Sequence, residues 1–354
     1  MKNSALFGFF PNLQPNRSGG IETSGRLAWE ALQTWYAARG EGATLFCYEW
    51  DGVRETERGF ERIVARRKTE AIWRALRVRE KPRVILVWHL AMLKLVPFLR
   101  APNARVLVFL HGIEAWRAQD ALTRRMLPRV NAFLCNSRFT RERFLQFQPH
   151  LNAHPFRVVL LGVGVPEPNH TPPMQPALLM LGRLARGEDY KGHREMLGAW
   201  DRVRAAIPDA QLWIAGDGDL RADLENIVRA KNLDASVKFF GRVTELRKQE
   251  LLRQCRAFAL PSRGEGFGLV YPEAMRMGRP CLVSDCDAGQ EVVNPPEAGL
   301  AVNPSDKDAL VNAVTRLLRA GDEWTQWSCA ARARYEKYFT AAQFQQRIVD
   351  GMVV

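Results

Sequence analysis

One stretch decides the predicted fold: Gly264-Glu265-Gly266-Phe267-Gly268-Leu269-Val270-Tyr271-Pro272-Glu273-Ala274-Met275. The apolar run before it, 257–261, is typical of the end of a buried strand, and Pro272 is tolerated at the start of a helix, which we expect over 271–277. The three glycines therefore lie between a strand and a helix. There the backbone can approach a ligand closely, and the free N–H groups of the helix start attract an anion or a ring of hydroxyl groups.

Two carboxylates frame this glycine-rich turn. Glu265 lies in the loop, where it can hydrogen-bond a sugar, and Glu273 lies at the helix start, where it can bind a second diol such as a ribose. Because no His or Cys lies beside them, we interpret the pair as recognising hydroxyl groups in preference to a metal ion, which predicts a sugar-nucleotide site. The alternative is a plain glycine-rich turn whose two carboxylates are solvated and are favoured by the helix dipole.

At these residues the chain resembles a known family. The wording EGFGLVYPEAMRMGRPCLVSD, with seven residues between Glu265 and Glu273, is similar to the E-x7-E signature of retaining, GT-B-fold glycosyltransferases of family 4, also called glycosyl transferases group 1. The resemblance implies an α/β fold, GT-B, in which two Rossmann-like domains face each other across a cleft and the C-terminal helix crosses back to the first domain. It covers most of 177–345 and the first half only at its strand ends.

Length and composition fit two domains. With 354 residues, 47% of them apolar, the chain is too long for one ordinary α/β domain. No run approaches the ~18 to 20 consecutive apolar residues of a spanning helix. The first apolar stretch is too short for a secretory signal, so we expect a cytoplasmic protein. The six cysteines are scattered, which predicts reduced thiols without disulfides or zinc.

Short apolar runs alternate with helical stretches in both halves, as in parallel sheets covered on both faces. The expected strands are 5–10, 44–48, 84–88, 105–110, 132–135, 157–161, 177–181, 211–215, 239–243, 257–261 and 280–284. Five prolines within 166–176 predict an interdomain linker. We therefore expect one Rossmann-like domain over 1–165 and a second domain over 177–339. The resemblance implies that the first is the acceptor-side domain, joined by 340–354 crossing back, and that the second binds the NDP-sugar.

The formal net charge of +13 favours a partner of opposite sign: anionic lipid, nucleic acid or a phosphorylated substrate. Between Arg54 and Arg83, eleven Lys or Arg accompany five Glu, and apolar residues from Phe60 to Leu76 recur at helical spacing. This pattern predicts a helix with a cationic face, which is either solvated or attracted to the anionic inner face of the cell membrane. Nucleic acid is not expected, since no finger, repeat or stacking-aromatic pattern accompanies the charge.

Candidate site residues of the first half follow its expected strands, because such sheets bind ligands at the carboxyl ends of parallel strands. Gly19-Gly20, at a helix entrance, can present N–H groups to phosphate, and Arg17 of the same loop is assigned to the acceptor side. His111 ends a strand where the resembled family has a His that faces the donor sugar. His89 and Ser137 are also assigned to the acceptor side; their alternatives are a structural histidine and a helix N-cap.

Cations follow the first expected strand of the second half. Arg183 can offer a diphosphate two parallel donors and Lys191 a point charge, although both are also compatible with surface charges. The resemblance implies that the donor's phosphates lie there and that the base lies beside Arg242 and Val243. The donor-binding residues that it implies are Gly19, Gly20, Gly182, Arg183, Lys191, Gly216, Asp217, Arg242, Val243, Glu265, Gly266, Phe267, Gly268, Leu269 and Glu273.

The resemblance implies transfer of a hexosyl group from an NDP-sugar, with UDP and GDP favoured, to a hydroxyl of a glycan or lipid-linked acceptor in cell-envelope or exopolysaccharide synthesis. The anomeric configuration would be retained. His111 and Glu265 would orient the sugar, and Arg183 and Lys191 would stabilise the departing diphosphate. No metal or other cofactor is expected. Two alternatives stay open: an NDP-sugar hydrolase or epimerase on the same fold, and a non-enzymatic basic module that binds nucleic acid or lipid.

Overall fold

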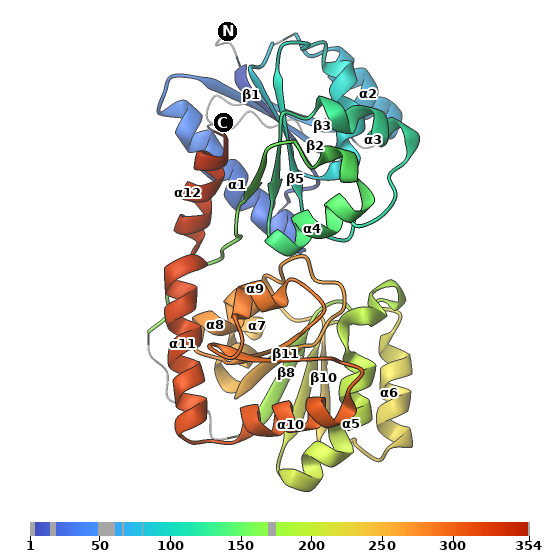
Figure 1. Ribbon diagram of the computed structural model, residues 1–354, viewed down its shortest axis with the longest axis vertical. Helices are drawn as coiled ribbons and strands as arrows, with labels where there is room; N and C mark the ends of the chain where they lie inside the picture. Colours follow the sequence, from blue (N-terminus) through green and yellow to red (C-terminus); the bar gives the residue numbers. More distant parts are fainter. Residues whose placement is uncertain are drawn as a thin grey trace. The chain divides into compact units, whose positions relative to one another are not determined.

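The computed structural model describes residues 4–14, 19–48, 61–65, 67–79, 81–168 and 175–352. The chain divides into two compact units, one formed by Met1–Gly162 with Ala341–Val354 and the other by Val163–Thr340. Each unit contains a parallel sheet with helices packed against it (Figure 1), which is an α/β architecture. Arg17 and residues 169–174 of the expected linker lie outside the described residues.

Among the described residues, the sheet of the first unit has seven strands in the order β3-β2-β1-β4-β5-β6-β7, paired in parallel throughout. Its strands are β1 Ser4–Phe10, β2 Gly42–Tyr48, β3 Glu61–Ala65, β4 Val84–Val87, β5 Arg105–Leu110, β6 Ala132–Cys135 and β7 Phe156–Val158. Its helices are α1 Gly20–Ala37, α2 Lys68–Leu76, α3 Ala121–Met126, α4 Arg138–Phe147 and the 3-10 segments η1 Leu90–Leu99, η2 Leu127–Arg129 and η3 Pro149–Leu151.

The helix expected between Phe60 and Leu76 is wrong in its first part. Strand β3 occupies the start of this range and pairs with β2 at the edge of the sheet, and α2 begins only at Lys68. Three consecutive residues are buried here, Ile63, Val64 and Ala65, as in a strand. A surface helix buries residues three or four apart instead. The open edge of β2 and the β-branched side chains outweigh the helical spacing here. Phe60 itself lies outside the described residues.

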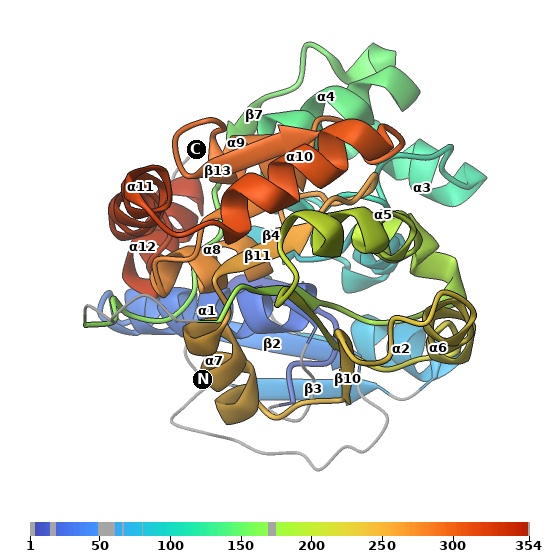
Figure 2. The ribbon, with the colours of Figure 1, turned by 90° about the horizontal axis from the view of Figure 1, so that it is seen from below.

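Helix α12, Ala341–Met352, belongs to the first unit although it follows the second unit in the sequence. It packs beside α1, as Figure 1 and Figure 2 both show. Arg157 Nη1 donates to the carbonyl oxygen of Asp350 at 3.0 Å, and Arg347 Nη1 donates to that of Leu160 at 3.1 Å. The predicted return of the C-terminal helix to the first domain is confirmed.

The sheet of the second unit has six strands in the described part of the chain, in the parallel order β10-β9-β8-β11-β12-β13. Its strands are β8 Ala177–Leu181, β9 Gln211–Ala215, β10 Val237–Gly241, β11 Ala257–Leu260, β12 Cys281–Ser284 and β13 Gly299–Val302. Its helices are η4 Arg186–Lys191, α5 His193–Ala206, α6 Arg221–Ala230, α7 Glu245–Gln254, α8 Val270–Arg276, α9 Gly289–Val293, α10 Lys307–Leu318 and α11 Asp322–Tyr338.

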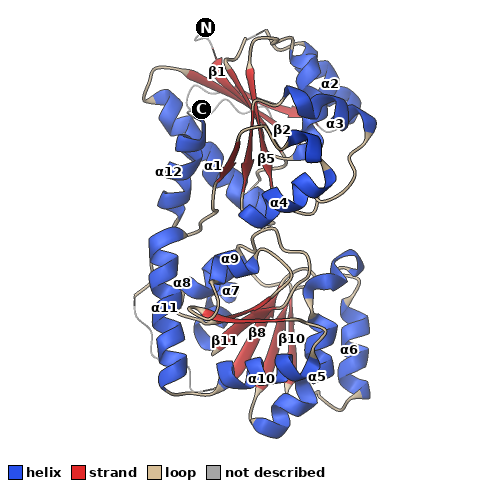
Figure 3. Cartoon of the chain, viewed as in Figure 1, coloured by secondary structure: helices blue, strands red, loops and turns tan. Residues whose placement is uncertain are grey.

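Each sheet reverses its strand order at one place. In the first unit β1 lies between β2 and β4, and in the second β8 lies between β9 and β11. The chain therefore winds outward in both directions from a central strand, with helices around each sheet (Figure 3). In doubly wound sheets, ligands bind outside the carboxyl ends of the strands at the point of reversal. In the second unit this point lies after β8 and β11.

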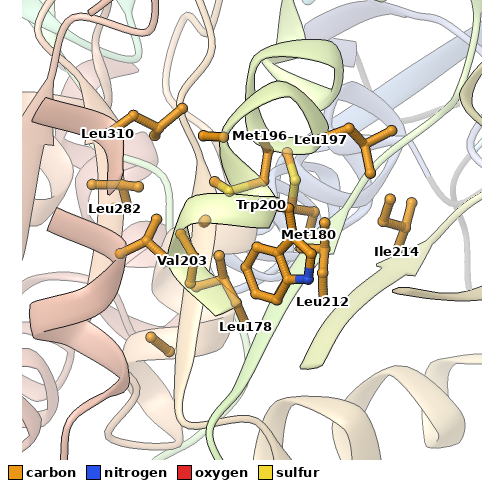
Figure 4. Close-up of a cluster of buried hydrophobic side chains, with 14 of the residues drawn as sticks. Leu178, Met180, Met196, Leu197, Trp200, Val203, Leu212, Ile214, Leu282 and Leu310 are labelled. Atoms are coloured by element: carbon orange, nitrogen blue, oxygen red, sulfur yellow. The ribbon is translucent and has the colours of Figure 1, made fainter. Parts of the chain in front are cut away.

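The core of the second unit fixes the helix that follows the first of these loops (Figure 4). Helix α5 buries Met196, Leu197, Trp200 and Val203 on one face, with the spacing of an amphipathic helix. Strands β8 and β9 supply the facing side chains, which include Leu178, Met180, Leu212 and Ile214. The start of α5, which follows the predicted phosphate-binding loop, is therefore anchored by a close-packed interior.

We expect Leu197→Ala to lower the free energy of unfolding of the second unit by about 2 to 5 kcal/mol, because Leu197 is fully buried and the truncation leaves a cavity. The matched control is Leu246→Ala in the same unit, where the leucine is 74% exposed and the change is expected to stay within about 0.5 kcal/mol. Urea unfolding measures both. Equal losses in the two variants would contradict this assignment of the core.

Candidate functional site

Three strands of the second unit end at one backbone junction. Gly182 N donates to the carbonyl oxygen of Ala215 at 3.0 Å, and Gly216 N donates to that of Gly241 at 2.8 Å. Gly216 has φ +145, and a β-carbon there would lie 1.8 Å from the carbonyl oxygen of Gly182, so only glycine fits. The structure therefore brings the predicted residues Gly182 and Gly216 together, and Asp217 directly follows, with its carboxylate accepting a hydrogen bond from Gly218 N at 2.9 Å.

The loops after β8 and β11 also contact each other directly. Arg263 N donates to the carbonyl oxygen of Tyr190 at 3.0 Å. Gly192 has φ +82, and a β-carbon on it would lie 2.6 Å from the carbonyl oxygen of Pro261. The segment that carries Lys191 is thus held against the segment that carries Glu265.

The carboxylate of Glu188 forms ion pairs with both predicted phosphate-binding cations, Arg183 and Lys191. Lys191 Nζ lies 2.6 Å from Glu188 Oε2, and the other oxygen of Glu188 pairs with Arg183 Nη2. The side chains of Lys191 and Glu188 are only 12% and 15% exposed, whereas that of Arg183 is 80% exposed. A β-carbon on Gly182 would lie 3.2 Å from Lys191 Nζ, so the ammonium group lies over that glycine. Glu188 was not assigned a role from the sequence, because a Glu among other charged residues has the pattern of a surface loop.

Glu265 is partly buried, and its loop is held by a carboxylate that the sequence reasoning missed. Burial raises the pKa of Glu265, and Lys191 opposes this shift. Glu265 N donates to Asp287 Oδ2 at 3.0 Å, and the carbonyl oxygen of Glu265 accepts from Ala288 N at 3.1 Å. Asp287 also accepts from Gly289 N at 2.9 Å and is itself buried, which raises its pKa to about 8. Two consecutive residues after β12 therefore fix both polar groups of the Glu265 backbone.

Glu273 lies in the first turn of α8, as predicted, but it has a partner that was not predicted. Lys248 Nζ, from α7, lies 2.7 Å from Glu273 Oε1 and 2.9 Å from Glu245 Oε2. Burial raises the pKa of Glu273, and Lys248 opposes this shift. Helix α7 was not identified from the sequence, so no signal indicated that Lys248 would reach Glu273.

The remaining predicted residues of the second unit lie in or after the same loops. Phe267 is buried and packs edge-on against Phe339, with 5.9 Å between the ring centroids, so its side chain is part of the interior. Gly266, Gly268 and Leu269 complete the turn into α8. Arg242 is exposed and Val243 partly buried, directly after β10.

In the first unit, His111 follows β5 and is buried. Its Nε2 lies 2.6 Å from the carbonyl oxygen of Trp88, and its backbone N–H donates to Glu114 Oε1 at 2.6 Å. The Asn136 side chain donates to the carbonyl oxygen of His111 at 2.6 Å. Burial lowers the pKa of His111 to about 4, so the ring is neutral at pH 7 with Nε2–H donating to Trp88.

The other predicted residues of the first unit have local structural roles. His89 Nδ1 accepts from Ala91 N at 3.2 Å, and Ser137 Oγ accepts from Thr140 N at 3.0 Å as the N-cap of α4. At Gly19-Gly20, where α1 begins, a β-carbon on Gly19 would lie 2.0 Å from a carboxylate oxygen of Glu22. That carboxylate therefore lies at the helix start for which we predicted a phosphate.

In the part of the chain that the structure describes, no three or more His, Cys, Asp or Glu side chains converge as a metal ion would require. None of the helices over the described ranges has the length and apolar character needed to cross a bilayer.

Comparison with known proteins finds relatives of the second unit. Residues 175–320 match the family described as glycosyl transferases group 1. A phosphatidyl-myo-inositol mannosyltransferase of Mycobacterium leprae is 31% identical over 182 residues, and the match covers 49% of this chain and 46% of that protein. A GDP-mannose-dependent monoacylated alpha-(1-6)-phosphatidylinositol monomannoside mannosyltransferase of Corynebacterium glutamicum is 33% identical over 167 residues, and the match covers 45% of this chain and 43% of that protein. The chain thus spans less than half the length of the curated relatives it matches.

A solved structure covers both units. HepE of Anabaena in complex with UDP has a TM-score of 0.76 to this chain, with 16% identity, and the likeness covers 100% of both chains. At this identity the likeness concerns the fold alone. It confirms the predicted α/β fold with two Rossmann-like domains, GT-B.

We expect His111 to make the first unit less stable as the pH falls from 6.5 to 4. Its pKa is about 4 when folded against 6.5 ordinarily, so the unfolded chain binds more protons in this range. The contribution of neutral His111 to the free energy of unfolding is therefore fully present above pH 6.5 and is lost as the pH falls towards 4. The total loss is about 3 kcal/mol. The gap between the urea midpoints of the parent and His111→Gln should therefore narrow on acidification. Burial lowers the pKa of His193 in the same way in both proteins, so its contribution cancels in the comparison. A difference between the two urea midpoints that does not change with pH would contradict the lowered pKa of His111.

Proposed function

We propose that this protein transfers a hexosyl group from an NDP-sugar to a hydroxyl group of a glycan or lipid-linked acceptor. The match of residues 175–320 to glycosyl transferases group 1 and the GT-B fold of the chain support this proposal. One observation carries the proposal. Lys191 and Glu265 lie in contacting loops after the paired strands β8 and β11, at the point where the strand order reverses and inside the family-matched segment.

Each group of this edge has a proposed partner on the donor. Arg183 and Lys191 bind the diphosphate, Glu265 binds hydroxyl groups of the sugar, and Glu273 binds the ribose. The glycines 182 and 216 let the nucleotide approach the backbone closely. His111, held neutral by burial, is the first unit's candidate for orienting the sugar, with His89 and Ser137 on the acceptor side.

The proposed reaction retains the anomeric configuration. The bond between the anomeric carbon and the phosphate oxygen breaks, and the acceptor oxygen bonds to the same face of that carbon. The acceptor proton passes to the departing phosphate oxygen, so no side-chain base is required. Negative charge grows on the diphosphate during this step, and fixed cations such as Lys191 lower the barrier because they need no reorganisation.

GDP-mannose and UDP-sugars are the donors to test first. One relative is named as dependent on GDP-mannose, and the structural neighbour was solved with UDP. A phospholipid-linked or lipopolysaccharide-type glycan is the first acceptor class, since both relatives are named as acting on phosphatidylinositol compounds. A hydrolase or an epimerase would consume donor without acceptor, so donor turnover measured with and without acceptor separates these alternatives.

We expect Lys191→Met to lower kcat/KM for sugar transfer by about 100-fold or more, as for other fixed donors at a developing negative charge. Lys238→Met is the matched control, because Lys238 is exposed on β10. Initial rates with the best donor from the nucleotide-sugar screen provide the measurement. Transfer that is unchanged in Lys191→Met would overturn the proposed role, and a non-enzymatic basic module would give no acceptor-dependent turnover in the parent.

We also propose peripheral association with an anionic membrane through α2, on which Trp73 and Leu76 are 50% and 38% exposed beside Arg77. The parent should float with vesicles of phosphatidylglycerol at low salt, and less so at high salt. Trp73→Ala combined with Leu76→Ala should lower the bound fraction by about tenfold. Leu246→Ala, which removes an exposed leucine from the second unit, should have no effect. Vesicle binding that is as strong in the Trp73→Ala, Leu76→Ala variant as in the parent would show that α2 does not contact the membrane.

A further inference from the structure

Glu188 forms ion pairs with both of the cations that the proposed function assigns to the donor diphosphate. One of its carboxylate oxygens pairs with Lys191 Nζ at 2.6 Å and the other with Arg183 Nη2. A single carboxylate therefore bridges two cations from opposite ends of one loop. This is the bridging geometry that a phosphate group would need in order to contact both side chains.

The position of Glu188 is imposed by its neighbours. Its backbone N–H donates to the carbonyl oxygen of Ala185 at 2.8 Å. On one side Arg186 N donates to Asp219 Oδ1 at 2.8 Å, and on the other Asp189 Oδ2 accepts from Arg194 Nε at 2.7 Å. The loop is thus tied to two further elements, and the Glu188 side chain, 15% exposed, faces the cations from within it.

The carboxylate and a diphosphate compete for the same donors. Both are oxyanions, and the ammonium group of Lys191 has few directions in which to donate because its side chain is only 12% exposed. A diphosphate that binds Lys191 and Arg183 must therefore displace Glu188 or accept its negative charge at close range. Either outcome costs binding free energy that a neutral residue at this position would not cost.

We propose that Glu188 is an internal competitor for the diphosphate: it neutralises Arg183 and Lys191 in the empty site, leaves them when the nucleotide binds, and returns to help expel the nucleoside diphosphate after transfer. This inference rests on the proposed function and deepens it, because it assigns to this loop control over product affinity. It predicts that the parent binds the nucleoside diphosphate more weakly than a site in which Arg183 and Lys191 are not paired with Glu188.

The test is the binding of UDP, GDP and inorganic pyrophosphate to the full chain by titration calorimetry. Glu188→Gln keeps the size of the side chain and removes its charge, and we expect about tenfold tighter binding of the preferred nucleoside diphosphate and of pyrophosphate. Product inhibition in the transfer assay should strengthen by the same factor. Glu188→Ala should also tighten binding, which guards against an effect particular to the amide.

Asp189→Asn is the matched control. It removes the same charge one residue along the chain but keeps a side-chain oxygen that can accept from Arg194 Nε, so the loop stays tied to α5. Asp189 pairs with Arg194 and not with the two cations. We expect its affinity for the diphosphate to stay within about twofold of the parent. Equal tightening in Asp189→Asn and Glu188→Gln would show a general effect of charge and overturn the specific role of Glu188.

The remaining outcomes separate this inference from the proposed function. If the parent binds a nucleoside diphosphate, Lys191→Met loses that binding, and Glu188→Gln binds no tighter than the parent, the inference fails and the proposed function stands. Weaker binding in both Glu188 variants would identify Glu188 as a positioning residue for the cations and would also overturn the inference. If neither the parent nor Glu188→Gln binds any of the three probes, and no NDP-sugar is turned over, both proposals fail together.

Discussion

Parallel pairing of β11 with β8 is the constraint on which the candidate site depends. It places the loops that follow the two strands at the same edge of the sheet, although Lys191 and Glu265 are far apart in the sequence. The close approach of Gly216 to Gly182 draws the end of β9 into the same edge. The buried face of α5 then anchors the helix that follows the first loop, so the backbone geometry of the site is supported by the interior of the second unit.

The charges at this edge are balanced in a way that composition does not indicate. The chain as a whole carries a formal net charge of +13, yet the two loop cations lie beside two carboxylates, Glu188 and Glu265. Glu188, Asp287 and Lys248 had no role before the fold was known. Each is a charged residue in a loop or on a helix surface, where the usual interpretation is solvation, and only the tertiary contacts of their side chains identify their partners.

The strands and the strand-end positions could be predicted because buried parallel strands are continuous apolar runs bounded by turn residues. Two strands could not. β3 carries charged residues and was taken for part of a helix, and β13 is a short run, Gly299–Val302, that begins with glycine. The glycine-rich turn with its two glutamates predicted the resemblance to glycosyl transferases group 1, since its spacing is specific, and residues 175–320 match that family. Which charged groups would pair could not be predicted, because ion pairs depend on neighbours from other elements.

Helix α12 makes the first unit discontinuous in the sequence, because its contribution follows the whole of the second unit. During synthesis, the second unit leaves the ribosome with all of its strands before the partner of α1 has been translated. The second unit can therefore fold as a continuous segment, while the surface of the first unit that α12 covers stays exposed until α12 itself has been released. The first unit, most of which precedes the second in the sequence, is thus the later of the two to have all of its elements available for packing.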